Sequence, residues 1–315
     1  MTNNLRKLMQ KILFLRNFKE IKKVKGHHIK VRDYYLHCLH HPQLDPYLYF
    51  TPESIYQDSE LWVDVPREKI VREIQLDLYN LIFVSGKDWT LLPEIPNGKK
   101  IISIVHAVKI ADADKVLFPF LSRPAFRICV SPEVLAAISL HAVGESVVIN
   151  NGVPMDLFRP GPERKQRSML IWAKKNPALG KRLYRELAKR GLDAALLIDF
   201  LPREEFARRL GESDVFIALP GQREGFYLPA LEGMASGCAV ICSDNVGNRG
   251  FCMHGETCLM PKYDDLEQHL AMIETLLAQT ELKEKIRRAG METARGYSLQ
   301  NERDRFYRFL EKYIL

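Results

Sequence analysis

The stretch VFIALPGQREGFYLPALEGMASGCAVICSD (215–244) decides the fold class. It begins with an apolar, strand-like run (215–220), passes through a polar loop into a small-residue helix (229–236), and ends in a second apolar run (239–243). Two buried strands joined through a helix are typical of a parallel sheet, because parallel neighbours need a crossover connection. We therefore expect an α/β protein.

The same alternation continues along the chain. Further strands are expected at 12–15, 47–50, 81–85, 100–106, 126–131, 147–150, 169–173 and 194–200, and further helices at 180–190, 202–210, 264–279, 281–295 and 299–315. Because 315 residues are many for one hydrophobic core, two parallel-sheet domains are predicted. A turn-rich, charged connection at 150–168 places the boundary near residue 160. The predicted domains are 1–159 and 160–298, with 299–315 docking back on the first.

Composition excludes several classes of protein. No apolar run approaches the roughly 20 residues of a membrane span, and the apolar run near the N-terminus is too short for a signal peptide. We therefore expect a cytoplasmic protein. The six cysteines form no CxxC pair, so a zinc site is not expected, and Cys129, Cys238 and Cys242 lie in apolar runs typical of reduced core residues.

Positive charge is concentrated at the N-terminus. Residues 1–32 hold ten Lys or Arg and one Glu, a local net charge of +9, whereas the remainder sums to −2. Such a segment can attract phosphates or an anionic membrane surface, or it can be a solvated helix face. Aromatic residues are not interleaved with the charges as stacking platforms, so nucleic-acid binding is not expected.

Two glutamates stand out in the loop and helix of 215–244. Glu224 lies in the loop and Glu232 on the helix, with seven residues between them. Pro229 suits a first helical position, and a helix starting there offers N–H groups and a positive dipole end to an anion. The carboxylates can accept hydrogen bonds from hydroxyls. This combination suits a nucleotide sugar, although a glutamate that only caps a helix gives the same pattern.

Other loops that follow strands carry candidate residues. Lys174, Lys175 and Lys181 surround a strand end and a helix start, where a diphosphate is commonly held, or they form a solvated basic loop. His106 ends a strand of the first domain and can donate a hydrogen bond to a ligand hydroxyl, or it can have a purely structural role. The loop after 12–15 leads to Gly26, His27 and His28, which line the acceptor side or form a turn.

These residues together resemble a known family. EGFYLPALEGMASGCAVICSD (224–244) resembles the E-x7-E signature of family 4-type, GT-B-fold retaining glycosyltransferases. The stretches 127–138, 147–160, 201–220 and 245–261 are similar to the segments that precede and follow that signature, whereas 1–99 match only loosely. The resemblance implies two Rossmann-like domains that face each other across a cleft. It also implies metal-independent transfer of a sugar from a nucleoside diphosphate donor, without a cofactor.

The resemblance implies roles for the two glutamates and the loop. Glu224 falls where the family contacts hydroxyls of the transferred sugar, and Glu232 falls where it holds the nucleotide ribose. The backbone that approaches the sugar and the diphosphate is that of Gly225, Phe226, Tyr227 and Leu228. The family usually has glycine where Tyr227 stands, so the approach is altered or an aromatic wall is added.

The resemblance also implies a leaving-group site and an acceptor side. Lys174 and Lys181 fall near a basic pair that neutralises the diphosphate, with Lys175 as the alternative to Lys174. His106 matches a histidine that faces the donor sugar. A glycan or lipid-linked glycan of cell-surface polysaccharide or lipopolysaccharide type is the expected acceptor, with the basic N-terminus peripheral at the inner face of the membrane. The alternatives are a non-catalytic sugar-nucleotide-binding partner subunit and another GT-B enzyme, such as a nucleotide-sugar epimerase or a phosphorylase.

Overall fold

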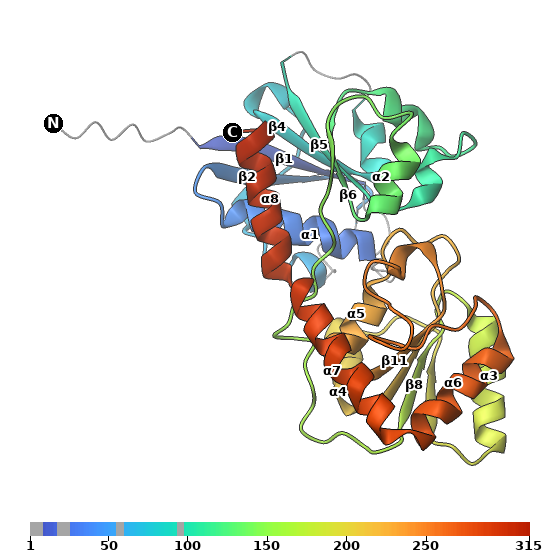
Figure 1. Ribbon diagram of the computed structural model, residues 1–315. Helices are drawn as coiled ribbons and strands as arrows, with labels where there is room; N and C mark the ends of the chain where they lie inside the picture. The colour runs from blue at the N-terminus through green and yellow to red at the C-terminus, as the bar shows by residue number, and fades with distance from the viewer. Residues whose placement is uncertain (1–8, 18–25, 55–59, 93–97) are drawn as a thin grey trace. The chain divides into compact units, whose positions relative to one another are not determined.

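The computed structural model describes residues 9–17, 26–54, 60–92 and 98–315, and half of the basic segment 1–32 lies outside these ranges. The chain forms two compact units (Figure 1). Unit 1 comprises 1–149 with 303–315, and unit 2 comprises 150–302. The first division thus falls ten residues before the predicted boundary at 160. Among the described residues, no helix is long and apolar enough to cross a membrane.

Unit 1 is built on a seven-stranded parallel sheet of order β3-β2-β1-β4-β5-β6-β7. The strands are β1 (Gln10–Arg16), β2 (Leu44–Phe50), β3 (Ile70–Val71), β4 (Leu81–Ser85), β5 (Lys100–Val105), β6 (Phe126–Cys129) and β7 (Ser146–Val148). All six predicted strands of this half are confirmed, and β3 was not predicted.

The described part of unit 1 contains three α-helices: α1 (Gly26–Leu39), α2 (Pro132–Ile138) and the greater part of α8 (Leu299–Tyr313). The described part of the unit also has 3-10 helices at Glu60–Trp62, Arg67–Lys69, Leu76–Leu78, Gly86–Leu91, Val108–Ala111 and Phe118–Ser122. Helix α8 docks on α1, since the Tyr307 hydroxyl donates to the His37 carbonyl at 2.8 Å and the Phe306 ring meets the Tyr34 ring edge-on.

Helix α1 corrects one interpretation of the sequence. The Gly26-His27-His28 stretch, which the sequence left as a possible turn, forms the first turn of a 14-residue helix. This helix has an unusual buried face, because Lys30, Asp33 and His37 are buried beside its aromatic residues.

Unit 2 is built on a four-stranded parallel sheet of order β11-β10-β8-β9, covered by helices on both faces. The strands are β8 (Met169–Trp172), β9 (Ala194–Leu197), β10 (Val215–Ala218) and β11 (Ala239–Cys242). The helices are α3 (Pro177–Lys189), α4 (Arg203–Glu212), α5 (Leu228–Ala235), α6 (Leu266–Ala278) and α7 (Thr280–Gly296), with a 3-10 helix at Val246–Asn248. The prediction of an α/β chain with two Rossmann-like parallel sheets is confirmed.

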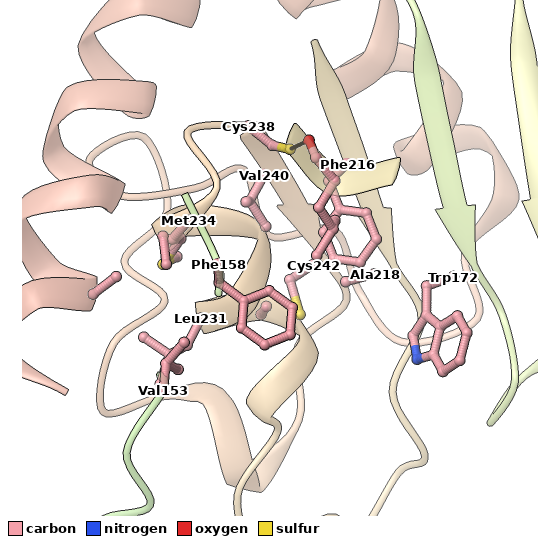
Figure 2. Close-up of a cluster of buried hydrophobic side chains, with 14 of the residues drawn as sticks. Val153, Phe158, Trp172, Phe216, Ala218, Leu231, Met234, Cys238, Val240 and Cys242 are labelled. Carbon is pink, nitrogen blue, oxygen red and sulfur yellow. Dashed lines mark hydrogen bonds between the residues drawn. The ribbon is translucent and has the colours of Figure 1, made fainter. Parts of the chain in front are cut away.

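Alternate residues of the unit 2 strands point into two separate cores, as expected for period-2 strands. Phe216 and Ala218 pack with α4 and α5, whereas Val215 and Ile217 pack with α3, α6 and α7. Figure 2 shows the first of these cores, in which Leu231 and Met234 of α5 pack near Phe158, Phe216 and Val240. Cys129, Cys238 and Cys242 are buried and free, as predicted.

Two glycines let helices approach the strands closely. A Cβ at Gly233 of α5 would lie 2.4 Å from the Phe216 ring, and a Cβ at Gly180 of α3 would lie 2.1 Å from the Ala173 Cβ. Real Cβ atoms do not approach other atoms this closely, so any residue other than glycine at these two positions would force the neighbouring atoms to move. The start of α5 and the loop before α3 are thereby held against the carboxyl end of the sheet.

Candidate functional site

The loops that leave the carboxyl ends of the unit 2 strands share one edge of the sheet. These loops are 173–176 after β8, 198–202 after β9, 219–227 after β10 and 243–245 after β11. In an open parallel sheet this edge is the usual ligand site, because helix N-termini and loop side chains converge there. The predicted residues of unit 2 lie on or next to these loops.

Lys175 and Glu224 meet at this edge. The Lys175 Nζ lies 3.1 Å from the Glu224 Oε1, although the two residues belong to different loops. Half of the Lys175 side chain and a quarter of the Glu224 side chain are exposed, at 51% and 25%. Asn176 fixes the lysine loop, because its Oδ1 accepts from the Leu179 N–H at 3.2 Å and its Nδ2 donates to Asp264 at 3.0 Å.

Lys174 and Lys181 point elsewhere. The Lys174 Nζ lies over the Phe200 ring, 2.9 Å from its centroid, and so faces the loop after β9. Lys181 lies on the exposed face of α3, and no contact links it to Lys175 or Glu224 in the part of the chain that the structure describes. The geometry therefore brings Lys175, rather than Lys174 or Lys181, to Glu224.

Glu232 is buried on α5 and paired with an arginine that the sequence analysis missed. Its Oε1 lies 3.1 Å from the Arg203 Nη1, and its side chain is only 5% exposed. The Arg203 guanidinium also lies over the Phe158 ring, 5.0 Å from its centroid. A cation in the first turn of a helix is unfavourable, because it opposes the helix dipole. The position of Arg203, directly after Pro202 at the start of α4, could therefore have indicated that this arginine has a specific partner.

The aromatic side chains of the loop turn away from the edge. Tyr227 is 3% exposed and belongs to the same hydrophobic core as Phe216 and Leu231, and Phe226 packs against the Phe251 ring at 5.3 Å. Burial, together with nearby groups that include Glu224, raises the pKa of the Tyr227 phenol well above its usual value. The phenol therefore stays neutral. Because its ring is buried in the core, Tyr227 does not form an aromatic wall over the loop. Gly225 is also buried, and Leu228 begins α5.

The segment after β11 supports this loop from behind. The Gly247 carbonyl accepts from the Tyr227 N–H at 3.0 Å. The Asn245 side chain accepts from the Gly247 N–H, and the Asn248 Nδ2 donates to the Ser243 carbonyl at 2.8 Å. The sequence analysis did not single out these residues, and the Asn-x-Gly-Asn spacing of a local cap was the available signal.

We expect a Gly247→Ala substitution to displace the Glu224 loop. The new Cβ would lie 2.6 Å from the Glu224 carbonyl oxygen and 2.7 Å from the Phe226 nitrogen, and both are backbone atoms. Overpacking of this kind costs about 1–3 kcal/mol of unfolding free energy, measurable by urea denaturation. Gly250→Ala is the matched control, because its Cβ would make only an ordinary contact at 3.6 Å. Equal stability of the two variants would contradict this account.

The predicted residues of unit 1 form a separate group at the carboxyl edge of that unit's own sheet. His106 follows β5, and its Nε2 lies 3.1 Å from the Ser85 Oγ. Its ring lies 6.0 Å from that of His27, which stacks at 4.1 Å on His28. Burial, and then the nearby charges of His27, Arg16 and Lys30, lower the pKa of His106 well below its usual value.

The unit 2 edge can bind a ligand that combines negative charge with hydroxyl groups. The α5 N-terminus and Lys175 offer positive potential, while Glu224 and Glu232 offer hydrogen-bond acceptors. Because each carboxylate already has a cation beside it, hydroxyls can bind there without leaving a buried charge uncompensated.

Part of the chain matches a known protein family. Residues 176–293 match the family described as glycosyl transferases group 1. D-inositol 3-phosphate glycosyltransferase of Corynebacterium efficiens is 28% identical over 169 residues, which cover 53% of this chain and 36% of that protein. The chain thus spans little more than a third of the curated relative's length.

Solved structures share the fold. The chain is similar to sucrose-phosphate synthase from Thermosynechococcus elongatus, with a TM-score of 0.72 and 14% identity over 96% of this chain and 99% of that one. It is also similar to HepE of Anabaena in complex with UDP-glucose, with a TM-score of 0.70 and 14% identity over 96% and 100% of the two chains. At this identity the likeness concerns the fold.

Proposed function

We propose that this chain, whose residues 176–293 match the family described as glycosyl transferases group 1, transfers a sugar from a nucleoside diphosphate donor with retention at the anomeric carbon. The observation that carries the proposal is the Lys175–Glu224 pair, set beside the start of α5 and the buried Glu232. A uridine diphosphate sugar is the first donor to test, since a solved structure of the same fold contains UDP-glucose. A glycan or lipid-linked glycan is the proposed acceptor.

The proposed reaction has one main barrier, which is departure of the diphosphate while positive charge builds on the sugar ring. Lys175 and the N–H groups at the start of α5 stabilise the negative charge of the leaving group, and a preorganised group of this kind is typically worth several kcal/mol. Glu224 accepts from sugar hydroxyls. In this scheme the leaving phosphate takes the acceptor's proton on the same face of the sugar, so no separate carboxylate base is required.

In the proposed donor complex, Glu232 holds the nucleotide ribose. Its carboxylate accepts hydrogen bonds from the ribose hydroxyls while Arg203 keeps it charged and oriented. Tyr227 is buried and Phe226 packs against Phe251, so their side chains leave the loop backbone to approach the diphosphate. Tyr227, which stands where the family usually has glycine, is therefore compatible with donor binding.

We expect Glu232→Ala to weaken donor binding. Calorimetry with a panel of nucleotide sugars and free nucleotides should show selective binding of one donor, and loss of a charged hydrogen-bond acceptor should weaken it by roughly 10–100-fold. Glu232→Gln keeps the shape of the side chain and should also bind less tightly. Glu204→Ala is the control, because Glu204 is an exposed neighbour of Arg203.

Two results would count against the proposal. Absence of binding to any nucleotide sugar, in well-folded protein, would remove the donor site. Donor binding without turnover, over a broad range of acceptors, would favour a non-catalytic sugar-nucleotide-binding subunit instead.

A further inference from the structure

Two residues other than glycine have a left-handed backbone among the residues that the structure describes. These are Arg167 and Asp264, with φ values of 63° and 61°. A side chain disfavours this conformation, which persists only where the surrounding structure imposes it, and such residues concentrate at functional sites. Arg167 lies just before the amino end of β8, away from the candidate site, whereas Asp264 lies just before α6.

The segment that carries Asp264 is fixed both to the start of α6 and to the end of β11. Asp265 caps α6, since its Oδ1 accepts from the Gln268 N–H at 3.0 Å. The His269 Nδ1 donates to the Asp265 carbonyl at 2.6 Å, and its Nε2 accepts from the Ser243 hydroxyl at 2.8 Å. Burial lowers the pKa of His269, so the ring stays neutral at neutral pH and keeps both bonds. Asp264 therefore extends from a rigid support.

The Asp264 carboxylate contacts the loop after β8. Its Oδ1 accepts from the Asn176 Nδ2 at 3.0 Å, although the two residues are 88 positions apart in the sequence. The Asn176 Oδ1 accepts from the Leu179 N–H at 3.2 Å, so the same side chain caps α3. Both ends of the amide are thus bonded, which fixes the backbone at Asn176, the residue directly after Lys175.

The Lys175–Glu224 pair is too exposed to hold the lysine in place by itself. Ion pairs at the surface contribute little, and holding a lysine side chain in one geometry costs rotamer freedom. Asparagine and aspartate have short side chains, which lose less freedom when they bond. The Asn176–Asp264 contact is therefore better suited to fix the loop from which Lys175 extends.

We propose that Asp264 is a positioning residue for Lys175. Acting through Asn176, it holds the start of α3 so that the Lys175 ammonium group reaches Glu224 and the leaving diphosphate of the donor. Asp264 itself contacts no reacting group in this scheme. The inference rests on the proposed function, because the position of Lys175 matters to catalysis only if a diphosphate leaves beside it.

Asp264→Gly separates positioning from stability. The substitution removes the carboxylate but relieves the left-handed backbone, so the variant should be no less stable than the wild type in urea denaturation. The kcat of sugar transfer should nevertheless fall roughly tenfold, because small misplacements of a catalytic group are costly. Asp264→Asn should recover most of this loss, since its amide oxygen can still accept from Asn176 and asparagine tolerates a positive φ.

Arg167→Gly is the matched control. Arg167 is exposed and has the same kind of backbone conformation, and its N–H, which donates to Asp214, is retained in the variant. This variant should also be no less stable than the wild type, and its kcat should be that of the wild type. A loss of kcat equal to that of Asp264→Gly would show that the effect comes from the backbone change alone and would overturn the proposal.

A double-mutant cycle tests whether Asp264 acts through Lys175. In a Lys175→Ala background, Asp264→Gly should cause no further loss of kcat, because the group that Asp264 positions is absent. Losses that add independently would mean that Asp264 acts by another route, and they would overturn the proposal.

Hydrogen exchange gives a readout that requires no turnover. In the free protein, Asp264→Gly should raise exchange in peptides that cover residues 173–179, whereas Arg167→Gly should not. A wild-type protein that transfers no sugar would reject the proposed function, while this difference in exchange would still show that Asp264 fixes the lysine loop. Exchange and kcat that both stay unchanged in Asp264→Gly would overturn the inference and leave the proposed function intact.

Discussion

Lys175→Ala is expected to lower kcat by roughly 10²–10³-fold while leaving the protein folded. The ammonium group lies 3.1 Å from Glu224, at the loop edge where the donor diphosphate is proposed to leave. Removing a preorganised charge affects the transition state more than the ground state, because negative charge on the leaving group grows as the bond breaks. The measurement is sugar transfer under saturating donor, which separates kcat from KM.

The neighbouring lysines are the controls for this prediction. Lys174 lies over the Phe200 ring and Lys181 on the exposed face of α3, so alanine at either position should change kcat by only a few-fold. A larger loss at Lys174 or Lys181 than at Lys175 would contradict the assignment. It would mean that the lysine side chains rearrange when the donor binds.

The strands of both sheets could be predicted because each is a short, apolar run bounded by polar residues. Strands buried on both faces have this signature, and all ten predicted strands are present. Strand β3 has only Ile70 and Val71 at the edge of its sheet, which is too short to leave a pattern. The close packing of α5 against the sheet could also be predicted from the sequence, because Gly233 lies within a run of small residues.

Helix α1 was missed for a physical reason. Its buried face carries Lys30, Asp33 and His37 between aromatic residues, so apolar residues do not recur at helical spacing. The polar groups are buried because Lys30 and Asp33 pair with each other. A pair of this kind satisfies both charges within one helical turn, but it removes the hydrophobic periodicity that identifies a helix.

Some features of the candidate site could likewise be predicted from the sequence and others could not. Glu224 and Glu232 could be found from their position after a strand and on the following helix. The sequence could not show which lysine contacts Glu224, because the side chains of adjacent loop residues follow no periodicity that would fix where each one points. The partner of Glu232 depends on how α4 and α5 pack, and the sequence does not specify that packing.

Asp214→Asn is expected to destabilise unit 2 by about 3–5 kcal/mol, because it leaves the buried Lys283 without a counter-charge, whereas Arg287 keeps its pair with Glu284. Asp214 is fully buried just before β10, and its carboxylate pairs with Lys283 at 2.7 Å and with Arg287, both on α7. It also accepts from the Arg167 N–H at 3.0 Å. Hydrogen exchange is the suitable measurement, since peptides from β8 to β11 should lose protection while β1, β4 and β5 serve as an internal control.

The difference between wild type and Asp214→Asn should depend on pH. Burial alone would raise the pKa of Asp214, but the Lys283 and Arg287 charges and the Arg167 N–H overcome it, so the pKa is lowered. A lowered pKa means that this stability is present above the unfolded value of about 3.9 and is lost as the pH falls through the folded value. The two proteins should therefore begin to converge below about pH 4 and become equal only below the lowered pKa of the folded carboxyl, where the wild-type side chain is also neutral.

Glu205→Gln is the matched control for this prediction. Glu205 pairs with Arg208 and Arg209 on the surface of α4, and hydrogen bonds from these arginines lower its pKa to about 2. Because these charges are solvated, the substitution leaves no buried cation without a counter-charge, and hydrogen exchange in unit 2 should remain close to that of the wild type. Similar losses in the two variants would show that net charge, rather than the buried position of Asp214, determines the stability of unit 2.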